Sequence, residues 1–175
     1  MSAPTNVVKG RTWRDMLISL VVLIVPVALL VAFASFVREG RQASVLDPAP
    51  VIAQAQAAGR FPVAAPRGLE DGWRPVSANF RTTADGATLR IGYVTPGGDG
   101  VQFVTSDVPA QQLLANELGE QARPVGTETI AGRSWQRYSA RAGETALVRA
   151  EPDHTLIVVG PATLDDLQAL AAAIG

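Results

Sequence analysis

The sequence predicts an α+β domain that follows a transmembrane helix. Two observations predict this class: an uncharged apolar run near the N-terminus, and seven short strand-like runs separated by turn residues. Two helical patterns accompany the strands, one in the middle of the domain and one at its end. We therefore expect a mainly antiparallel sheet of six or seven strands with two packed helices.

The segment 16–37 (MLISLVVLIVPVALLVAFASFV) contains no ionisable side chain. At 1.5 Å per residue it spans roughly 33 Å, enough to cross a hydrocarbon core of about 30 Å. Three basic residues precede this run, Lys9, Arg11 and Arg14, and two follow it, Arg38 and Arg41. The positive-inside rule therefore favours a cytoplasmic N-terminus. We expect a single-pass plasma-membrane protein with a cytoplasmic tail at 1–15 and an extracytoplasmic C-terminal domain.

A cleaved signal peptide is the alternative for this segment. Ala32, Phe33 and Ala34 form an A-x-A-like cleavage site after a basic region. The apolar run is longer than the usual signal-peptide core of about 7–15 residues and continues past this site, which favours a retained anchor. Both interpretations place the rest of the chain outside the cytoplasm.

Residues 38–66 are rich in alanine and proline and are interpreted as a tether. Within it, Asp47-Pro48 is a good helix start and Gly59 a good helix end, so a short helix is expected over 49–58. A spacer is favoured over a partner-binding helix because the apolar stripe is mostly alanine. The compact domain is expected at 67–175.

The first half of the domain has three alternating runs, 73–80, 88–95 and 101–106. Asp85-Gly86 and the segment 96–100 separate them with hairpin chemistry, which predicts an antiparallel meander. Asp107 and Pro109 then open a helix through about Leu118, with Leu114 and Leu118 on its apolar face.

The second half repeats this order of elements. Four further strands are expected at 127–130, 133–140, 145–150 and 155–160, joined by short antiparallel connections. The run 156–159 is apolar on both faces, which is typical of a central, covered strand. Thr163 and Asp166 form a capping box for the last helix, whose apolar stripe contains Leu164, Leu167, Ala171 and Ile174.

Composition excludes several kinds of site. The chain has no cysteine and one histidine, His154, which excludes disulfides, thiol nucleophiles, cysteine-ligated metals and a multi-histidine metal centre. We therefore expect no cofactor and no metal. Residues 42–175 carry ten basic and fourteen acidic side chains, and this acidic balance argues against a nucleic-acid partner.

Several short motifs together resemble a known family. These are Gly72-Trp73, Gly92-Tyr93-Val94, Gly132 with Trp135, and the step Val159-Gly160 into the last helix. With the basic tail, the membrane segment and the tether, they resemble domain-of-unknown-function family 4245. The resemblance implies a single-pass protein of an actinobacterial cell envelope and brings no activity or catalytic residues. By element order, the exported domain also resembles the sandwich of the Mog1/PsbP type.

Two groups of residues are candidates for binding. Arg133, Arg137 and Arg141 are evenly spaced around Trp135, and such a stripe is suited to an anionic envelope polymer, lipid headgroups or an acidic protein segment. The alternative buries Trp135 and leaves the arginines extended at its edges. Tyr93, Phe103 and Trp135 are the candidate lining of a pocket for a small apolar or lipid ligand.

Catalysis has little support in the sequence. His154 with Ser134 and Asp153 has the composition of a hydrolase triad, but no G-x-S-x-G elbow is present. The alternative is an exposed hairpin histidine beside Pro152. We therefore expect a non-catalytic envelope protein whose exported domain binds a protein partner or an envelope component. The second hypothesis is a carrier or sensor of an apolar or lipid ligand.

Overall fold

The computed structural model describes residues 13, 24, 45–141 and 143–174. Within these residues the chain forms one seven-stranded antiparallel sheet and three helices longer than one turn, which confirms the predicted α+β class. Residues 43–175 constitute one compact unit. No helix among the described residues is long and apolar enough to cross a membrane. Of the predicted cytoplasmic tail at 1–15 and membrane span at 16–37, all but Trp13 and Ile24 lie outside the described residues.

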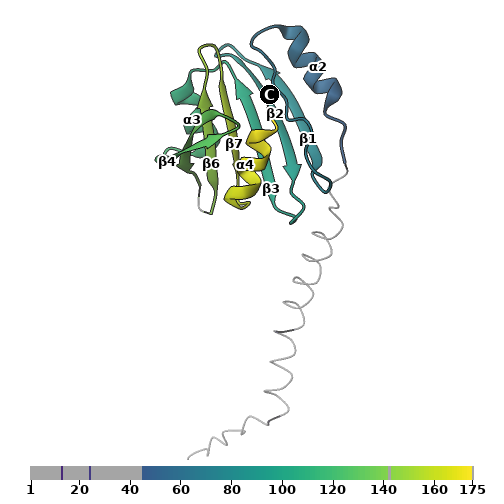
Figure 1. Ribbon diagram of the computed structural model, residues 1–175, viewed down its shortest axis with the longest axis vertical. Helices are drawn as coiled ribbons and strands as arrows, with labels where there is room; N and C mark the ends of the chain where they lie inside the picture. Colours follow the sequence, from purple (N-terminus) through teal and green to yellow (C-terminus); the bar gives the residue numbers. More distant parts are fainter. Residues whose placement is uncertain (1–12, 14–23, 25–44, 142, 175) are drawn as a thin grey trace, which may run out of the picture. The chain divides into compact units, whose positions relative to one another are not determined.

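The strands follow one another in the sheet order β1-β2-β3-β7-β6-β5-β4 (Figure 1). The elements in chain order are α2 (Ala49–Ala58), β1 (Arg74–Thr82), β2 (Ala87–Val94), β3 (Gly100–Ser106), α3 (Ala110–Leu118), β4 (Arg123–Ile130), β5 (Arg133–Ser139), β6 (Thr145–Ala150), β7 (Thr155–Gly160) and α4 (Leu164–Ala172). All seven predicted strands are present. The largest difference is in β4, which begins four residues before the predicted start because Pro124 and Gly126 obscure an exposed edge strand.

Strand β7 joins the two halves at the centre of the sheet. It pairs with β3 on one side and with β6 on the other, and all six of its residues are buried. This agrees with the central, doubly covered strand that the apolar run 156–159 predicts.

Each face of the sheet has its own apolar layer. One layer contains Leu89, Phe103, Trp135 and Leu156 with Leu167 of α4, and α2 packs at its margin. We call this the α4 face. The other layer contains Val104, Val148 and Ile157 under Leu113 and Leu118 of α3, and we call it the α3 face.

Helix α2 has the predicted bounds and ends at Gly59, whose φ of 60° is the left-handed conformation of a helix C-cap. The segment around it differs from a free tether. Phe61 and Ala65 are buried, Leu46 N–H donates to the Pro75 carbonyl at 2.8 Å, and Arg67 N–H donates to the Ala173 carbonyl at 2.9 Å. Residues 45–66 therefore pack against the sheet, and the compact unit begins well before the predicted boundary at 67.

The buried side of α3 also differs from the prediction. Leu113, Glu117 and Leu118 are its buried residues, whereas Leu114 is half-buried. An acidic side chain thus occupies a position on the apolar side of the helix. Its partner is Arg90 of β2.

Candidate functional site

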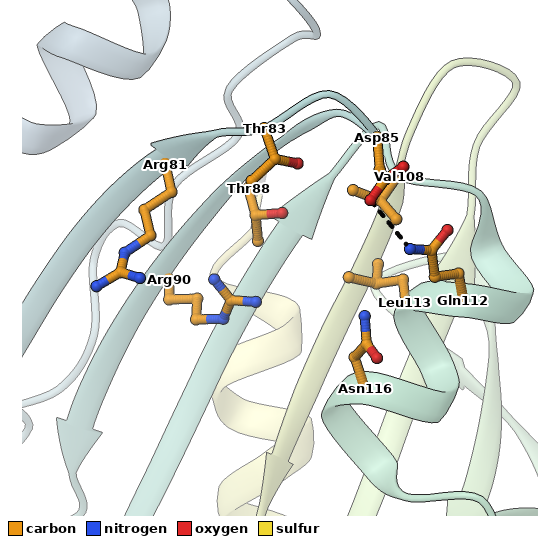
Figure 2. A pocket seen from close by; sticks show the side chains of 9 residues that line it. All are labelled: Arg81, Thr83, Asp85, Thr88, Arg90, Val108, Gln112, Leu113 and Asn116. Carbon is orange, nitrogen blue, oxygen red and sulfur yellow. Dashed lines mark hydrogen bonds between the residues drawn. The ribbon is translucent and has the colours of Figure 1, made fainter.

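A polar cavity of about 260 Å³ lies on the α3 face, between the β1–β2 hairpin and α3 (Figure 2). Helix α3 packs over the strands at the centre of the sheet, so it does not cover the polar residues that β1 and β2 present on this face. The cavity is lined by Arg81, Thr83, Asp85, Thr88, Arg90, Val108, Gln112, Leu113 and Asn116. We refer to it as the hairpin pocket.

Arg90 and Glu117 form an ion pair beside the pocket. The Arg90 Nε donates to Glu117 Oε1 at 3.1 Å, and Arg90 Nη2 pairs with the same oxygen. The Glu117 side chain is 9% exposed and that of Arg90 is 32% exposed. Glu117 therefore holds the guanidinium in place and offsets its charge, while part of Arg90 remains accessible from the pocket.

Hydrogen bonds fix the wall at the hairpin turn. Gln112 Nε2 donates to Asp85 Oδ2 at 3.3 Å, which links the turn to α3. Below it, the Thr88 and Ser106 hydroxyls are 2.8 Å apart, and Ser106 Oγ donates to the Ala87 carbonyl at 2.8 Å. The pocket floor is thus held by bonds between β2 and β3.

The turn itself depends on Gly86, whose φ is 151°. A Cβ atom at this position would clash with the Asp107 carboxylate and with Val108. Asp107 in turn accepts a bond from the Ala87 N–H at 2.5 Å and another from Arg60 Nε at 2.9 Å. The close approach of backbone and carboxylate explains why glycine follows Asp85 here.

Arg81 lies on the outer side of the pocket and is exposed. Its Nε donates to Asn79 Oδ1 at 3.1 Å, which leaves its two Nη groups for other partners. Asn116 on α3 and Thr83 on the hairpin add an amide and a hydroxyl. The lining therefore offers both donors and acceptors.

The pocket presents charged groups, hydroxyls and amides. The Asp85 carboxylate in its lining accepts a bond from Gln112, and the Glu117 carboxylate beside it accepts bonds from Arg90. Among the described residues, no group of three or more His, Asp or Glu side chains is arranged to hold a metal ion. What the arrangement can do is hold a small polar molecule by hydrogen bonds and charge.

The structure places the predicted arginine stripe in three different environments. Arg133 is exposed, Arg137 Nη1 is 3.2 Å from Glu128 Oε1, and Arg141 donates to the Asn116 carbonyl at 3.0 Å. Trp135 is fully buried on the α4 face, with the Arg149 guanidinium 4.9 Å from its ring centroid. Because β5 ends at Ser139, Arg141 leaves the strand and contacts α3 on the opposite face.

The predicted apolar pocket residues lie together in the core. Tyr93, Phe103 and Trp135 are 4%, 0% and 0% exposed and belong to the layer on the α4 face. Trp73 contacts Tyr93 edge to face, with ring centroids 6.3 Å apart. Burial raises the pKa of Tyr93 to about 12.

His154 differs from the predicted exposed hairpin histidine. It is 9% exposed and stacks on Phe61, with ring centroids 5.9 Å apart. Its Nδ1 is 2.6 Å from Asp153 Oδ1, and this bond lowers the pKa of Asp153. Ser134 lies on β5 next to Trp135, so its side chain points to the opposite face of the sheet from that of Trp135. His154 serves to fix the segment that follows α2.

Sequence reasoning missed the hairpin pocket. The one signal was Glu117, four residues after Leu113 and next to Leu118, because a carboxylate on the buried side of a helix requires a partner. The alternating run 88–95 contained that partner, Arg90, on its polar face.

The comparison with protein families decides the affiliation of the chain. The family model described as a protein of unknown function (DUF4245) matches residues 9–174. The chain belongs to domain-of-unknown-function family 4245. No curated protein matches the chain. The match confirms the family resemblance that the Gly-Trp and Gly-Tyr-Val motifs indicate, and it covers the hairpin pocket as well.

Proposed function

We propose that this member of family 4245 is a non-catalytic, single-pass protein of an actinobacterial cell envelope. Its domain at 45–174 would bind an envelope component outside the plasma membrane. The hairpin pocket carries this proposal, because its charged groups are held by internal bonds and its amides and Arg81 remain accessible. Polar groups that are fixed in position orient a bound ligand and provide specificity.

The topology rests on the sequence. An uncharged run of 22 residues, with more basic residues before it than after it, supports an anchor at 16–37 with the N-terminus inside. The finer fold assignment to the Mog1/PsbP sandwich stays a prediction, and superposition on structures of that type tests it.

The carrier hypothesis has less support. It requires space around Tyr93, Phe103 and Trp135, and these side chains are packed into the apolar layer together with α4. The described cavities on the domain surface are lined by other residues.

Topology and binding can be tested in one experiment because the chain contains no cysteine. Thr83→Cys places a unique thiol at the rim of the pocket, and Ser2→Cys places one near the N-terminus. In intact cells, a membrane-impermeant maleimide should label the first variant and not the second. Labelling of Ser2→Cys alone would refute the proposed orientation.

The same site reports on binding. A photo-crosslinking residue at Ala84, an exposed position of the same hairpin turn that does not line the pocket, should capture an envelope component, whereas one at Ala57, on the exposed side of α2, should not. Capture of the same species in equal amounts from both positions, or from neither, would refute a binding role for the pocket.

A further inference from the structure

The charges that line the hairpin pocket are arranged with opposite signs at its two ends. Arg81 and Arg90 lie at the end formed by the strands, and Asp85 lies at the turn, bonded to Gln112 (Figure 2). Glu117 offsets Arg90 from behind. Two positive and two negative groups therefore surround the site, so a simple anion would meet only a modest net attraction.

The remaining lining consists of hydroxyls and amides. Thr83 and Thr88 contribute hydroxyls, and Gln112 and Asn116 contribute amide groups that both donate and accept. The Thr83 hydroxyl donates to the Gly86 carbonyl at 3.1 Å, which leaves its oxygen as an acceptor. A ligand that satisfies this lining must itself carry several groups that donate and accept, as sugar hydroxyls do.

The two arginines at the strand end of the pocket favour a ligand that also carries a negative charge. Guanidinium groups recognise carboxylates by paired N–H donors, and Arg81 uses only Nε in its bond to Asn79. Arg90 binds Glu117 through Nε and Nη2, which leaves Nη1 for a ligand. A carboxylate between these two side chains would receive charge-assisted bonds from both.

The size of the cavity limits the ligand. Its volume of about 260 Å³ is slightly below the roughly 300–1,000 Å³ of sites that enclose drug-sized molecules. One sugar ring, with its carboxylate toward the arginines and its hydroxyls toward the turn, matches this volume. Val108 and Leu113 supply an apolar patch for the ring's C–H groups.

We propose that the hairpin pocket binds an acidic sugar, either free or as a unit of an anionic polysaccharide. The proposal deepens the binding function proposed above and rests on it for its location outside the membrane. Arg81 and Arg90 hold the carboxylate, and Asn116, Gln112 and Thr83 select the hydroxyls.

The test uses the full-length protein in mild detergent, titrated with glucuronic acid by isothermal calorimetry and by ligand-observed NMR. Glucose, which lacks the carboxylate, and acetate, which lacks the hydroxyls, should each bind at least tenfold more weakly. Arg81→Gln should weaken glucuronate binding about tenfold, the loss expected for one charge-assisted contact in a partly solvated site. The matched control Arg74→Gln changes an exposed arginine on the same strand and should have no effect.

A second variant and a longer ligand complete the design. Asn116→Ala removes a partner of the sugar hydroxyls, so it should reduce the preference for glucuronate over acetate. Arg81→Gln removes a partner of the carboxylate, so it should reduce the preference for glucuronate over glucose. A glucuronate-containing oligosaccharide that binds more tightly than the monosaccharide identifies a polymer unit as the ligand, and equal affinity identifies the free sugar acid.

Several results would overturn the proposal. These are acetate binding as tightly as glucuronate, equal weakening by Arg81→Gln and Arg74→Gln, or no glucuronate binding at millimolar concentration. In the last case, specific crosslinking from Ala84 would show that the binding function stands and that only the ligand class is wrong. If the chain binds glucuronate but the maleimide test places the pocket inside the cell, the ligand class stands and the proposed location outside the plasma membrane is wrong.

Discussion

Replacement of Glu117 by glutamine tests whether the Arg90–Glu117 pair stabilises the domain. The change keeps the shape of the side chain and removes its charge, so the bonds from Arg90 become bonds to a neutral oxygen. Hydrogen bonds to charged groups contribute about 1.5–3 kcal/mol and neutral ones about 1 kcal/mol. Since Arg90 is 32% exposed and partly screened, we expect a loss of about 1–2 kcal/mol.

The assay is urea unfolding and thermal unfolding of residues 43–175, both monitored by circular dichroism. A loss of this size lowers the melting temperature of a domain of this length by roughly 4–7 °C. Glu120→Gln, an exposed glutamate just after α3, is the matched control and should stay within about 0.5 kcal/mol.

A double-mutant cycle separates the pair from the rest of the helix. Arg90→Met and Glu117→Met should each destabilise the domain, and the double variant should recover much of the loss because both charges are then absent. Additive losses in the double variant, or a Glu117→Gln loss equal to that of Glu120→Gln, would refute the reasoning.

Three further predictions concern other parts of the domain. Phe61→Ala should lower the free energy of unfolding, measured in urea, by about 3–4 kcal/mol, because Phe61 is 7% exposed and stacks on His154. A loss below about 1 kcal/mol would mean that the segment after α2 is only a loosely packed spacer. The stability of the domain should fall as pH rises from about 10 to 12, because the pKa of Tyr93 is near 10 in the unfolded chain and near 12 in the folded domain. Tyr93→Phe should remove this decrease from a plot of melting temperature against pH. The Asp153–His154 bond lowers the pKa of Asp153, so its contribution to stability is present above the ordinary aspartate pKa of 3.8 and is lost as pH falls below that value. Asp153→Asn should therefore reduce the loss of stability at acid pH in the same plot. An unchanged loss would contradict the role of this bond.

Local patterns predicted the sheet well. Alternating apolar residues in β2, β3 and β5 indicate strands, and Asp85-Gly86 and Ala131-Gly132 mark two of the hairpins. These signals depend on neighbours a few residues away, which a sequence contains directly. The capping box at Thr163 is of the same kind, and the Thr163 hydroxyl does accept the Asp166 N–H at 3.2 Å.

Contacts between distant segments were not predictable in this way. The weak apolar stripe of α2 gave no sign that Val51, Ile52 and Ala55 would pack beside β1, because the amount of apolar surface left uncovered on the sheet depends on the whole fold. The partners Arg90 and Glu117 are 27 residues apart and lie in different kinds of element. Their meeting follows from the position of α3 on the sheet, which no local pattern specifies.

The central position of β7 sets the order in which the domain can be completed. Until β7 is available, β3 has an unpaired edge, and Val104 and Phe103 lack the strand that covers their flank. The centre of the sheet is therefore completed by a strand that follows β3 by about 50 residues in the chain, so its pairing closes a long loop. Without β7, strands β1–β3 and β4–β6 would form two separate antiparallel ribbons, because β7 pairs with β3 on one side and with β6 on the other.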